Sequence, residues 1–255
     1  MPLISLLKKL SNLSKLKKFK KLKILKKPPV CTALIAAAGS SLRCKGEDKL
    51  FYLIKNKPVL AYTIEAFQKC PLINDIIIVA QENRFEMIAD ICKKYGHKKV
   101  SKIIKGGGTR PESVLNGLYA VSKKSNLVAI HDGARPGIDA EIRKEAIIKA
   151  SKHHASAPAV PITSTIKKVD RDIITETVSR EDLYEIQTPQ VFRVELIKAA
   201  LTDVLDKNTE ITDDCMAVEI LGVPVYITEG SRKNIKITDI DDLHLAEIFL
   251  SKENR

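Results

Sequence analysis

The sequence lacks the features that mark several classes of protein. Its five cysteines are odd in number and scattered, and no pair has the spacing of metal ligands, which argues against a zinc site or a disulfide framework. No apolar run suits a membrane span or a secretory signal, because lysines interrupt the apolar residues near the N-terminus. These absences favour a cytoplasmic protein with reduced thiols.

The chain also lacks the residue patterns of covalent catalysis. It shows no Ser-His-Asp or Cys-His arrangement, and Cys44 has no histidine near it in the sequence that would activate its thiol. We therefore interpret Cys44 as a packing residue.

Acidic residues are absent from the first 27 positions. This segment holds ten lysines, so the remaining 228 residues carry a net charge of only +2 out of the total of +12. The basic character belongs to an extension that ends at Pro28 and Pro29, and it does not indicate a nucleic-acid-binding domain.

Only the first half of this extension has the pattern of an amphipathic helix. At 100° per residue, five leucines fall within one arc of about 120°: Leu3, Leu6, Leu7, Leu10 and Leu13. Three interpretations of residues 1–27 stay open: weak contact with an anionic membrane, contact with another polyanion, or a disordered extension.

After the extension, expected strands and helices alternate. Short β-branched runs predict strands at residues 31–36, 75–81, 99–105, 127–132 and 156–162. Helices are expected between several of them, at residues 58–70, 83–95 with Asn83 as the cap, and 111–121. This order predicts an α/β fold with a largely parallel sheet covered by helices on both faces, whose ligands gather at the carboxyl ends of the strands.

The stretch at residues 36–50, AAAGSSLRCKGEDKL, follows the first expected strand. Backbone N–H groups in a turn of Ala, Gly and Ser can surround a phosphate, and Arg43 and Lys49 add positive charge beside it. Taken alone, the pattern favours neither a phosphate site nor a tight strand-to-helix connection.

Two later loops belong to the same expected sheet edge. Residues 106–114 place three glycines and Arg110 before a helix, with Ser113 either near a ligand or capping that helix. In HDGARP, His131 and Asp132 end a strand and Arg135 follows, so they suit either a functional site or the satisfaction of backbone groups.

Seven motifs in order resemble the 2-C-methyl-D-erythritol 4-phosphate cytidylyltransferases, enzymes of the non-mevalonate isoprenoid pathway. They are AAAGSSLR with Lys49, GGGTRPESVLNGL, HDGARP, TIKKV, TVSREDLYEIQTPQVF, EITDDCMAVE and EGSRKNIKIT. The resemblance runs from about residue 32 to about residue 250. It implies a Rossmann-like nucleotidyltransferase fold with a protruding β-arm at about residues 163–185. We therefore expect a nucleotidyltransferase domain at residues 30–255 after a lysine-rich extension and linker at residues 1–29.

The resemblance also implies an activity and roles for individual residues. The family transfers CMP from CTP to 2-C-methyl-D-erythritol 4-phosphate, with release of pyrophosphate. Catalytic roles are implied for Arg43, Lys49, Arg180 and Lys236. Nucleotide-binding roles are implied for Ala37, Ala38, Gly39, Gly107, Arg110, Ser113 and Gly133. Contacts with the polyol phosphate are implied for Asp132, Arg135, Thr165, Arg180, Thr188 and Thr212.

The partners implied are a metal ion and a second subunit. Mg²⁺ would be held mainly by the CTP phosphates, and the β-arm would reach the pocket of the other subunit in a homodimer. The residues themselves indicate no metal cage, since Asp132, Asp213 and Asp214 suit only an outer or single ligand. Asp213 and Asp214 would equally suit the start of a helix.

Two other functions stay open at this stage. A cytidylyltransferase for ribitol 5-phosphate has overlapping motifs, and an inactive scaffold that binds membranes or polyanions through the lysine-rich extension is the alternative of a different class. The chain departs from the family pattern at Ser41, where Gly is common, and in a loop one residue shorter before Lys49.

Overall fold

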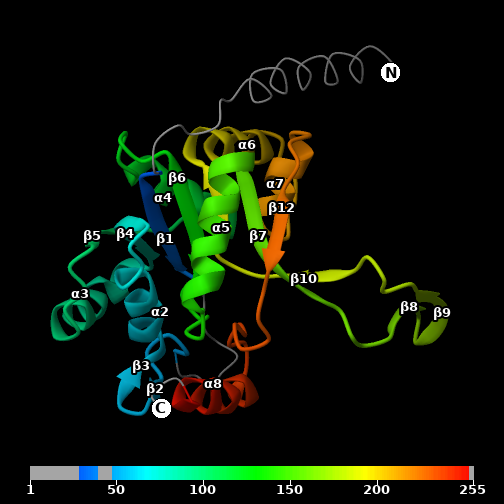
Figure 1. The fold of residues 1–255 in the computed structure, drawn as a ribbon, viewed down its shortest axis with the longest axis horizontal. Helices are drawn as coiled ribbons and strands as arrows, with labels where there is room; N and C mark the ends of the chain where they lie inside the picture. The colour runs from blue at the N-terminus through cyan, green and yellow to red at the C-terminus, as the bar shows by residue number, and fades with distance from the viewer. Residues whose placement is uncertain (1–28, 40–47, 253–255) are drawn as a thin grey trace.

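The computed structural model describes residues 29–39 and 48–252. Within them, eight strands form one sheet in the order β10-β7-β11-β6-β1-β4-β5, with β12 paired to β7 (Figure 1). The strands are β1 (Cys31–Ala37), β4 (Ile73–Ala80), β5 (Val100–Lys105), β6 (Leu127–Asp132), β7 (Ala155–Pro161), β10 (Tyr184–Ile186), β11 (Gln190–Arg193) and β12 (Tyr226–Glu229).

The sheet is mostly parallel, as the sequence predicts. Strand β1 pairs in parallel with β4 and β6, β4 pairs in parallel with β5, and β12 pairs in parallel with β7. Strands β10 and β11 run antiparallel to their neighbours. Since the carboxyl ends of β1, β4, β5 and β6 share one edge, the loops after them meet there.

Helices cover both faces of the sheet. They are α2 (Val59–Gln68), α3 (Phe85–Lys94), α4 (Arg110–Ala120), α5 (Ala140–His153), α6 (Val194–Asp206), α7 (Asp214–Ile220) and α8 (Ile240–Lys252), with a 3₁₀ turn, η1, at Glu82–Arg84. The buried side chains of the described residues form two clusters: one joins α2, α5 and α8 to the sheet, and the other joins α4, α6 and α7 to it.

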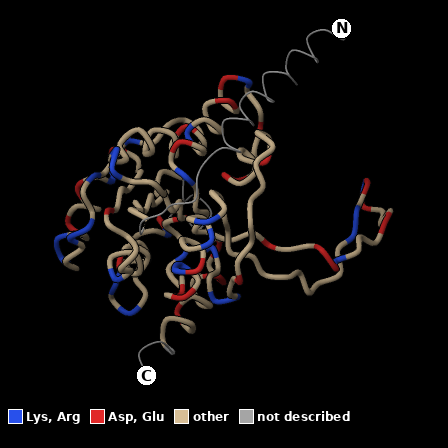
Figure 2. Tube along the Cα trace, turned by 45° about the horizontal axis from the view of Figure 1, so that its top comes forward, with Lys and Arg blue, Asp and Glu red and all other residues tan. Residues whose placement is uncertain are grey.

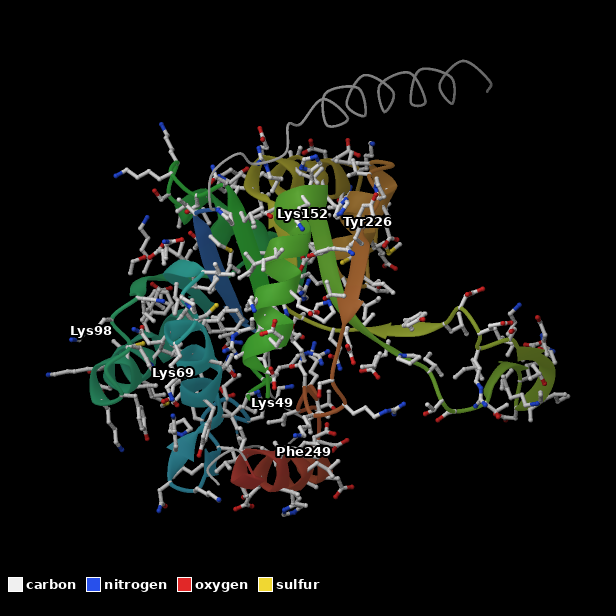
Figure 3. All side chains as sticks on the ribbon, viewed as in Figure 1. Lys49, Lys69, Lys98, Lys152, Tyr226 and Phe249 are labelled. Atoms are coloured by element: carbon white, nitrogen blue, oxygen red, sulfur yellow. The ribbon has the colours of Figure 1, made fainter. Side chains whose placement is uncertain are left out.

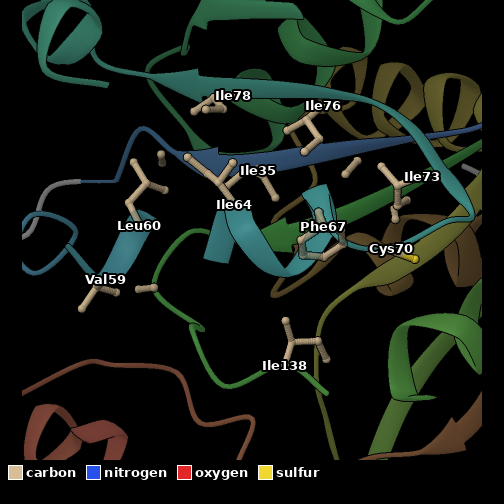
Figure 4. Close-up of a cluster of buried hydrophobic side chains, with 14 of the residues drawn as sticks. Ile35, Val59, Leu60, Ile64, Phe67, Cys70, Ile73, Ile76, Ile78 and Ile138 are labelled. Carbon is tan, nitrogen blue, oxygen red and sulfur yellow. The ribbon is translucent and has the colours of Figure 1, made fainter. Parts of the chain in front are cut away.

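Alternation along the strands produces these two clusters. Ile35 of β1 belongs to the same cluster as Ile76 and Ile78 of β4, and Figure 4 shows them beside α2, near Leu60, Ile64 and Phe67. Leu34, the residue before Ile35, faces the other cluster, because successive side chains of a strand point to opposite faces. The continuous apolar runs in the sequence therefore reflect strands buried on both faces.

Two expected helix starts are wrong in detail. Asn83 lies in η1 and does not cap α3, whose preceding residue, Arg84, makes no side-chain capping bond. Helix α4 is capped by Thr109, which forms a capping box with Glu112, so Ser113 is not the cap. The cap of α4 thus lies four residues before Ser113, whose hydroxyl donates to the Thr109 carbonyl.

The expected β-arm is confirmed as a hairpin that projects from the body (Figure 1). It consists of β8 (Ile166–Asp170) and β9 (Ile173–Val178), which pair with each other outside the main sheet. The arm ends slightly earlier than expected, since Tyr184 already belongs to β10 and pairs with β7. A second small hairpin, β2 (Leu53–Ile54) and β3 (Lys57–Pro58), precedes α2.

Charges of both signs are spread over the described body and arm, as Figure 2 shows. This distribution agrees with the small net charge outside the first 27 residues. Among the described residues, no helix has the length and apolar content needed to cross a membrane. The amphipathic helix expected in residues 1–27 lies outside the described residues, as do Ser41, Arg43 and Cys44.

Candidate active site

A cavity of about 830 Å³ lies at the carboxyl ends of the parallel strands. Its walls come from segments far apart in the sequence: the end of β1, the loop before α4, the loop after β6, and the segment before α8. The predicted residues that line it are Ala37, Ala38, Gly39, Lys49, Gly107, Arg110, Ser113, Asp132, Gly133 and Lys236. The structure therefore brings together the loops that the sequence assigned to one sheet edge.

The glycine-rich loop before α4 is packed closely against the end of β1. A Cβ atom on Gly106 would stand 2.6 Å from the Cβ of Ala38, so this position tolerates only glycine without movement. The N–H of Gly107 donates to Ser113 Oγ at 3.0 Å, and the Ser113 hydroxyl donates to the Thr109 carbonyl at 2.8 Å. Ser113 thus fixes the shape of the loop at the cavity wall.

Arg110 is held by a buried carboxylate. Its guanidinium donates to both oxygens of Asp214, at 2.9 and 2.8 Å, and lies 3.8 Å from Asp132. Burial by itself would lower the pKa of Arg110, but the negative charge of Asp214 and then of Asp132 raises it above its ordinary value. Arg110 is therefore a permanent positive charge in a fixed orientation at the cavity.

Asp214 is positioned by the start of α7. Asp213 is the N-cap residue and accepts from the Met216 N–H, which confirms the helix-start interpretation of this acidic pair. The side chain of Gln190 accepts from the N–H groups of Asp214 and Cys215 and donates to Asp213. Gln190 stands in the QTPQVF motif, but no sequence pattern indicates that it reaches α7.

The carboxylate of Asp132 is surrounded by positive charge. Lys236 Nζ lies 3.2 Å and Arg135 Nε 3.3 Å from Asp132 Oδ2. Burial would raise the pKa of Asp132, but Lys236, Arg110 and Arg135 outweigh it and lower that pKa below its ordinary range. Asp132 is therefore ionised and links the cations of the cavity to one another.

Arg135 lies behind the cavity and does not line it. Its side chain is buried and donates to the Asn234 carbonyl at 2.7 Å, while the Asn234 amide donates to the Thr188 carbonyl at 2.9 Å. These bonds hold the segment that carries Lys236 beside the end of β6. Asn234 was not foreseen from the sequence, because its partners lie 46 and 99 positions away.

Thr188 and His131 form a second layer under Asp132. The Thr188 hydroxyl is 2.9 Å from His131 Nδ1 and accepts from the Asp132 N–H at 3.2 Å. Burial lowers the pKa of His131 to about 3, so its ring is neutral. Thr188 is 4 % exposed and does not line the cavity, so its predicted contact with substrate stays a prediction.

Lys49 reaches the cavity from the turn before β2. Its ammonium donates to the Ile237 carbonyl at 2.8 Å, and the Ile237 N–H donates to Ala134 O. Figure 3 shows Lys49 in the region between the sheet and α8. Lys49 therefore lies on the same side of the sheet as Lys236, as the sequence predicts for a phosphate site.

Thr165, Arg180 and Thr212 are not brought to this cavity within one chain. Thr165 and Arg180 flank the β-arm, where Arg180 donates to the Thr163 carbonyl. Thr212 is exposed and lies 3.8 Å from the sulfur of Met216. Their predicted contacts with the polyol phosphate stay predictions.

The acids of the cavity suit a metal ion only as an accessory ligand set. No group of three or more His, Cys, Asp or Glu residues that could hold a metal occurs within the described part of the chain. Asp132 and Glu82 line the cavity, and Glu82 is paired with Lys105 at 2.7 Å. One ionised carboxylate, Asp132, fits an ion whose other ligands come from a bound polyphosphate.

These features define an α/β protein whose cavity suits a phosphorylated ligand: close-packed small residues, fixed cations, and one carboxylate at the carboxyl ends of parallel strands. Within that class, the sequence profile of the family described as 2-C-methyl-D-erythritol 4-phosphate cytidylyltransferase matches residues 31–252. The chain belongs to this family and is a CTP-dependent nucleotidyltransferase.

Individual relatives agree with this assignment. The chain is 44% identical over 225 residues to a 2-C-methyl-D-erythritol 4-phosphate cytidylyltransferase of Clostridium acetobutylicum, covering 87% of this chain and 98% of that protein. It is equally identical, over 224 residues, to one from Caldanaerobacter subterraneus, covering 87% of this chain and 99% of the relative.

Solved structures share the fold. The 4-diphosphocytidyl-2C-methyl-D-erythritol synthase of Anaerococcus prevotii superposes with a TM-score of 0.78 at 32% identity, covering 88% of this chain and 97% of the other. The 2-C-methyl-D-erythritol 4-phosphate cytidylyltransferase of Thermus thermophilus gives 0.72 at 29% identity, covering 86% and 98%. The predicted Rossmann-like nucleotidyltransferase fold is thus confirmed. The ribitol phosphate and scaffold alternatives do not fit the family assignment.

Proposed function

We propose that this cavity is where the enzyme transfers CMP from CTP to 2-C-methyl-D-erythritol 4-phosphate, giving the CDP-linked methylerythritol and pyrophosphate. The observation that carries the proposal is the arrangement of Lys49, Arg110 and Lys236 in one cavity with the ionised Asp132. Two polyanions must approach each other in this reaction, and fixed cations reduce their repulsion.

The reaction needs no covalent intermediate with the protein. A phosphate oxygen of the methylerythritol phosphate attacks the α-phosphorus of CTP, and the bond from that phosphorus to the bridging oxygen of the β-phosphate breaks. The attacking oxygen carries negative charge already, so no base has to remove a proton. Positioning and charge stabilisation are then the main contributions of the side chains.

We assign the nucleotide to the wall made by the end of β1 and the loop before α4. Small residues there would let phosphate and cytidine come close to the backbone, and Arg110 would supply fixed charge. The residues proposed for this role are Ala37, Ala38, Gly39, Gly107, Arg110, Ser113 and Gly133. Lys49 and Lys236 would contact the reacting phosphates, together with Arg43, which lies outside the described residues.

A divalent metal ion, Mg²⁺ in our proposal, would be held mainly by the CTP phosphates with Asp132 as its protein neighbour. When bound, it would neutralise charge on the pyrophosphate group. Asp132 also forms ion pairs with Lys236 and Arg110, so its carboxylate orients these two cations without a metal ion.

We propose a homodimer in which the β-arm completes the pocket of the other subunit. Three apolar side chains of the arm are largely exposed, Val169 at 59 %, Ile173 at 68 % and Ile174 at 61 %. An isolated hairpin with such side chains is poorly stable unless it packs against something, and a second copy would cover them. Such a pairing would bring Thr165 and Arg180 to the polyol phosphate, with Thr188, Thr212, Asp132 and Arg135 from the body.

The remaining proposals concern organisation and location. We assign residues 30–255 to the catalytic domain and residues 1–29 to a lysine-rich extension, supported by the family match beginning at residue 31. The extension would make at most weak contact with anionic membranes or polyanions. A cytoplasmic location is supported by the free thiols of Cys31, Cys70, Cys92 and Cys215.

Pyrophosphate release by the purified full chain tests the function directly. We expect release from CTP and Mg²⁺ with 2-C-methyl-D-erythritol 4-phosphate, and much less with ribitol 5-phosphate as the matched acceptor. No release with the first acceptor would overturn the proposed reaction. Sedimentation at several concentrations tests the homodimer, which a purely monomeric species would exclude.

A further inference from the structure

Arg84 is a buried cation that the reaction described above does not use. It ends η1, directly after β4, and is 8 % exposed. Its Nη1 donates to the carbonyls of Ala37 at 2.9 Å and Gly39 at 3.0 Å. Its Nη2 lies 2.7 Å from Asp48 Oδ2. One guanidinium therefore binds the residues on both sides of the segment 40–47.

The partners of Arg84 lie in or next to two walls of the cavity assigned to CTP. Ala37 and Gly39 line it at the end of β1, and Asp48 precedes Lys49, which lines it and donates to the Ile237 carbonyl. Arg84 itself does not line the cavity. Any effect of Arg84 on the reaction must therefore pass through the backbone and side chains that it holds.

The turn that carries Lys49 is built on Asp48. The N–H of Leu50 donates to Asp48 Oδ1 at 3.1 Å, and the N–H groups of Phe51 and Tyr52 donate to the Asp48 carbonyl at 2.9 and 3.2 Å. A carboxylate that organises a turn and is itself fixed by a buried guanidinium gives that turn one orientation.

The contacts with β1 have an electrostatic consequence as well. Gln81 Nε2 donates to the Ala38 carbonyl at 3.0 Å, so Arg84 and Gln81 together occupy three consecutive carbonyls at the cavity wall. Carbonyl oxygens that were left free there would repel the oxygens of a triphosphate. Donors from η1 and the residue before it engage these oxygens and bring positive charge behind the wall.

We propose that Arg84 is a positioning residue for CTP: it joins the end of β1 to the turn that carries Lys49 and sets the spacing of the two phosphate-binding walls. The inference rests on the proposed function, because it concerns the wall assigned to CTP. Arg84→Lys keeps the charge but loses the planar fork that reaches three acceptors, so it separates geometry from charge.

The experiment compares Arg84→Lys, Asp48→Asn and their double variant with a control, Arg143→Lys. Arg143 is a comparably buried arginine on α5 that donates to the Ile138 carbonyl and does not line the cavity. For each protein, steady-state pyrophosphate release gives kcat and the KM of each substrate. Amide exchange followed by mass spectrometry gives a second measurement, on the turn at residues 48–52 without any substrate.

For Arg84→Lys we expect kcat/KM for CTP to fall about a hundredfold, the order expected for a displacement of about 1 Å at a reacting group. The KM for the polyol phosphate at saturating CTP should change less than about twofold. Asp48→Asn should lose roughly tenfold, and the double variant should be no worse than Arg84→Lys, because both remove the same contact. Exchange of the amides at 50–52 should become faster in Arg84→Lys but not in Arg143→Lys.

Wild-type kcat/KM for CTP in both Arg84→Lys and Asp48→Asn would overturn the proposal, even if their melting temperatures fall. Equal losses in Arg143→Lys would also overturn it, since the effect would then belong to any buried arginine. If Arg84→Lys does not fold, kcat/KM for CTP in Asp48→Asn tests the proposal by itself, and a wild-type value would overturn it. A wild-type chain that releases no pyrophosphate would refute the proposed function instead, while unchanged exchange at residues 50–52 would refute the role of Arg84 independently.

Discussion

Replacing Asp214 by asparagine tests how Arg110 is held at the cavity that we assign to CTP. Asparagine keeps the shape and one acceptor of Asp214 but removes the negative charge. The side chain of Asp214 is fully buried, whereas that of Arg110 is 32 % exposed, so the guanidinium can turn toward water once its partner is weakened. We therefore expect the substitution to change the orientation of the Arg110 guanidinium, while its positive charge stays near the cavity.

The size of the effect follows from the two hydrogen bonds. One charge-assisted bond is lost outright and the other is weakened, worth about 1.5–3 kcal/mol before solvent is considered. Water at the exposed part of Arg110 offsets some of this, which leaves about 2 kcal/mol. If the loss appears in the orientation of Arg110, kcat/KM for CTP falls about 30-fold.

The assay combines steady-state kinetics with thermal unfolding, and Asp203→Asn is the matched control. Asp203 is also a buried acid, 4 % exposed, and pairs with Lys207 on α6 away from the cavity. Both variants should lose stability, but only Asp214→Asn should lose kcat/KM for CTP. Wild-type kcat/KM in a folded Asp214→Asn enzyme would refute the reasoning that Asp214 orients Arg110.

Four further predictions address packing, pH, subunit sharing and the extension. Gly117→Ala places a methyl group 2.6 Å from two buried side chains under α4 and should cost about 1–3 kcal/mol of stability. The melting temperature should fall while the KM of both substrates stays unchanged. An unchanged melting temperature would show that α4 can move away from the sheet. Burial and the charge of Lys57 lower the pKa of His97 to about 4, so the folded state binds fewer protons than the unfolded state below about pH 6.5. The free energy of unfolding should therefore fall by roughly 1–2 kcal/mol, after solvent screening, as the pH drops from about 6.5 to 4. Urea unfolding of His97→Gln should lack this part of the pH dependence, and a pH profile identical to that of the wild type would contradict the prediction. Mixing Arg180→Ala with Lys49→Ala subunits should restore part of the activity that each variant alone loses, and no recovery in a confirmed mixed dimer would exclude a shared pocket. Deleting residues 1–27 should leave kcat and both KM values within about twofold, whereas a large loss would show that the extension belongs to the domain.

Local sequence patterns predicted much of the sheet. The strand at residues 127–132 was predicted to the residue, because a buried parallel strand is a short apolar run that stops at a polar pair, here His131 and Asp132. The order of strands and helices, with the rule for the carboxyl ends of strands, placed three loops at one edge. That prediction needed no knowledge of which side chains touch.

Side chains that act over long distances in the sequence could not be predicted this way. Gln190 accepts a hydrogen bond from Asp214 of α7, 24 positions away in the sequence. Arg84 donates to the Ala37 carbonyl, 47 positions away, and Arg110 donates to Asp214, 104 positions away. Their residue types carry no signal at short range, because glutamine and arginine occur as readily on solvated surfaces. Only the packing of the helices against the sheet brings the partners together.

The errors at the helix starts have a more local origin, since Thr109 and Glu112 form the capping box of α4. Local sequence offered Asn83 and Ser113 as caps, but η1 takes up Asn83, and Ser113 binds the glycine-rich loop instead. The sequence by itself determined the alternation of elements, the family and the residue types at the cavity. Tertiary structure decided which of those side chains point into the cavity and which, like Arg135 and Thr188, hold it from behind, because that choice depends on contacts between segments that are distant in the chain.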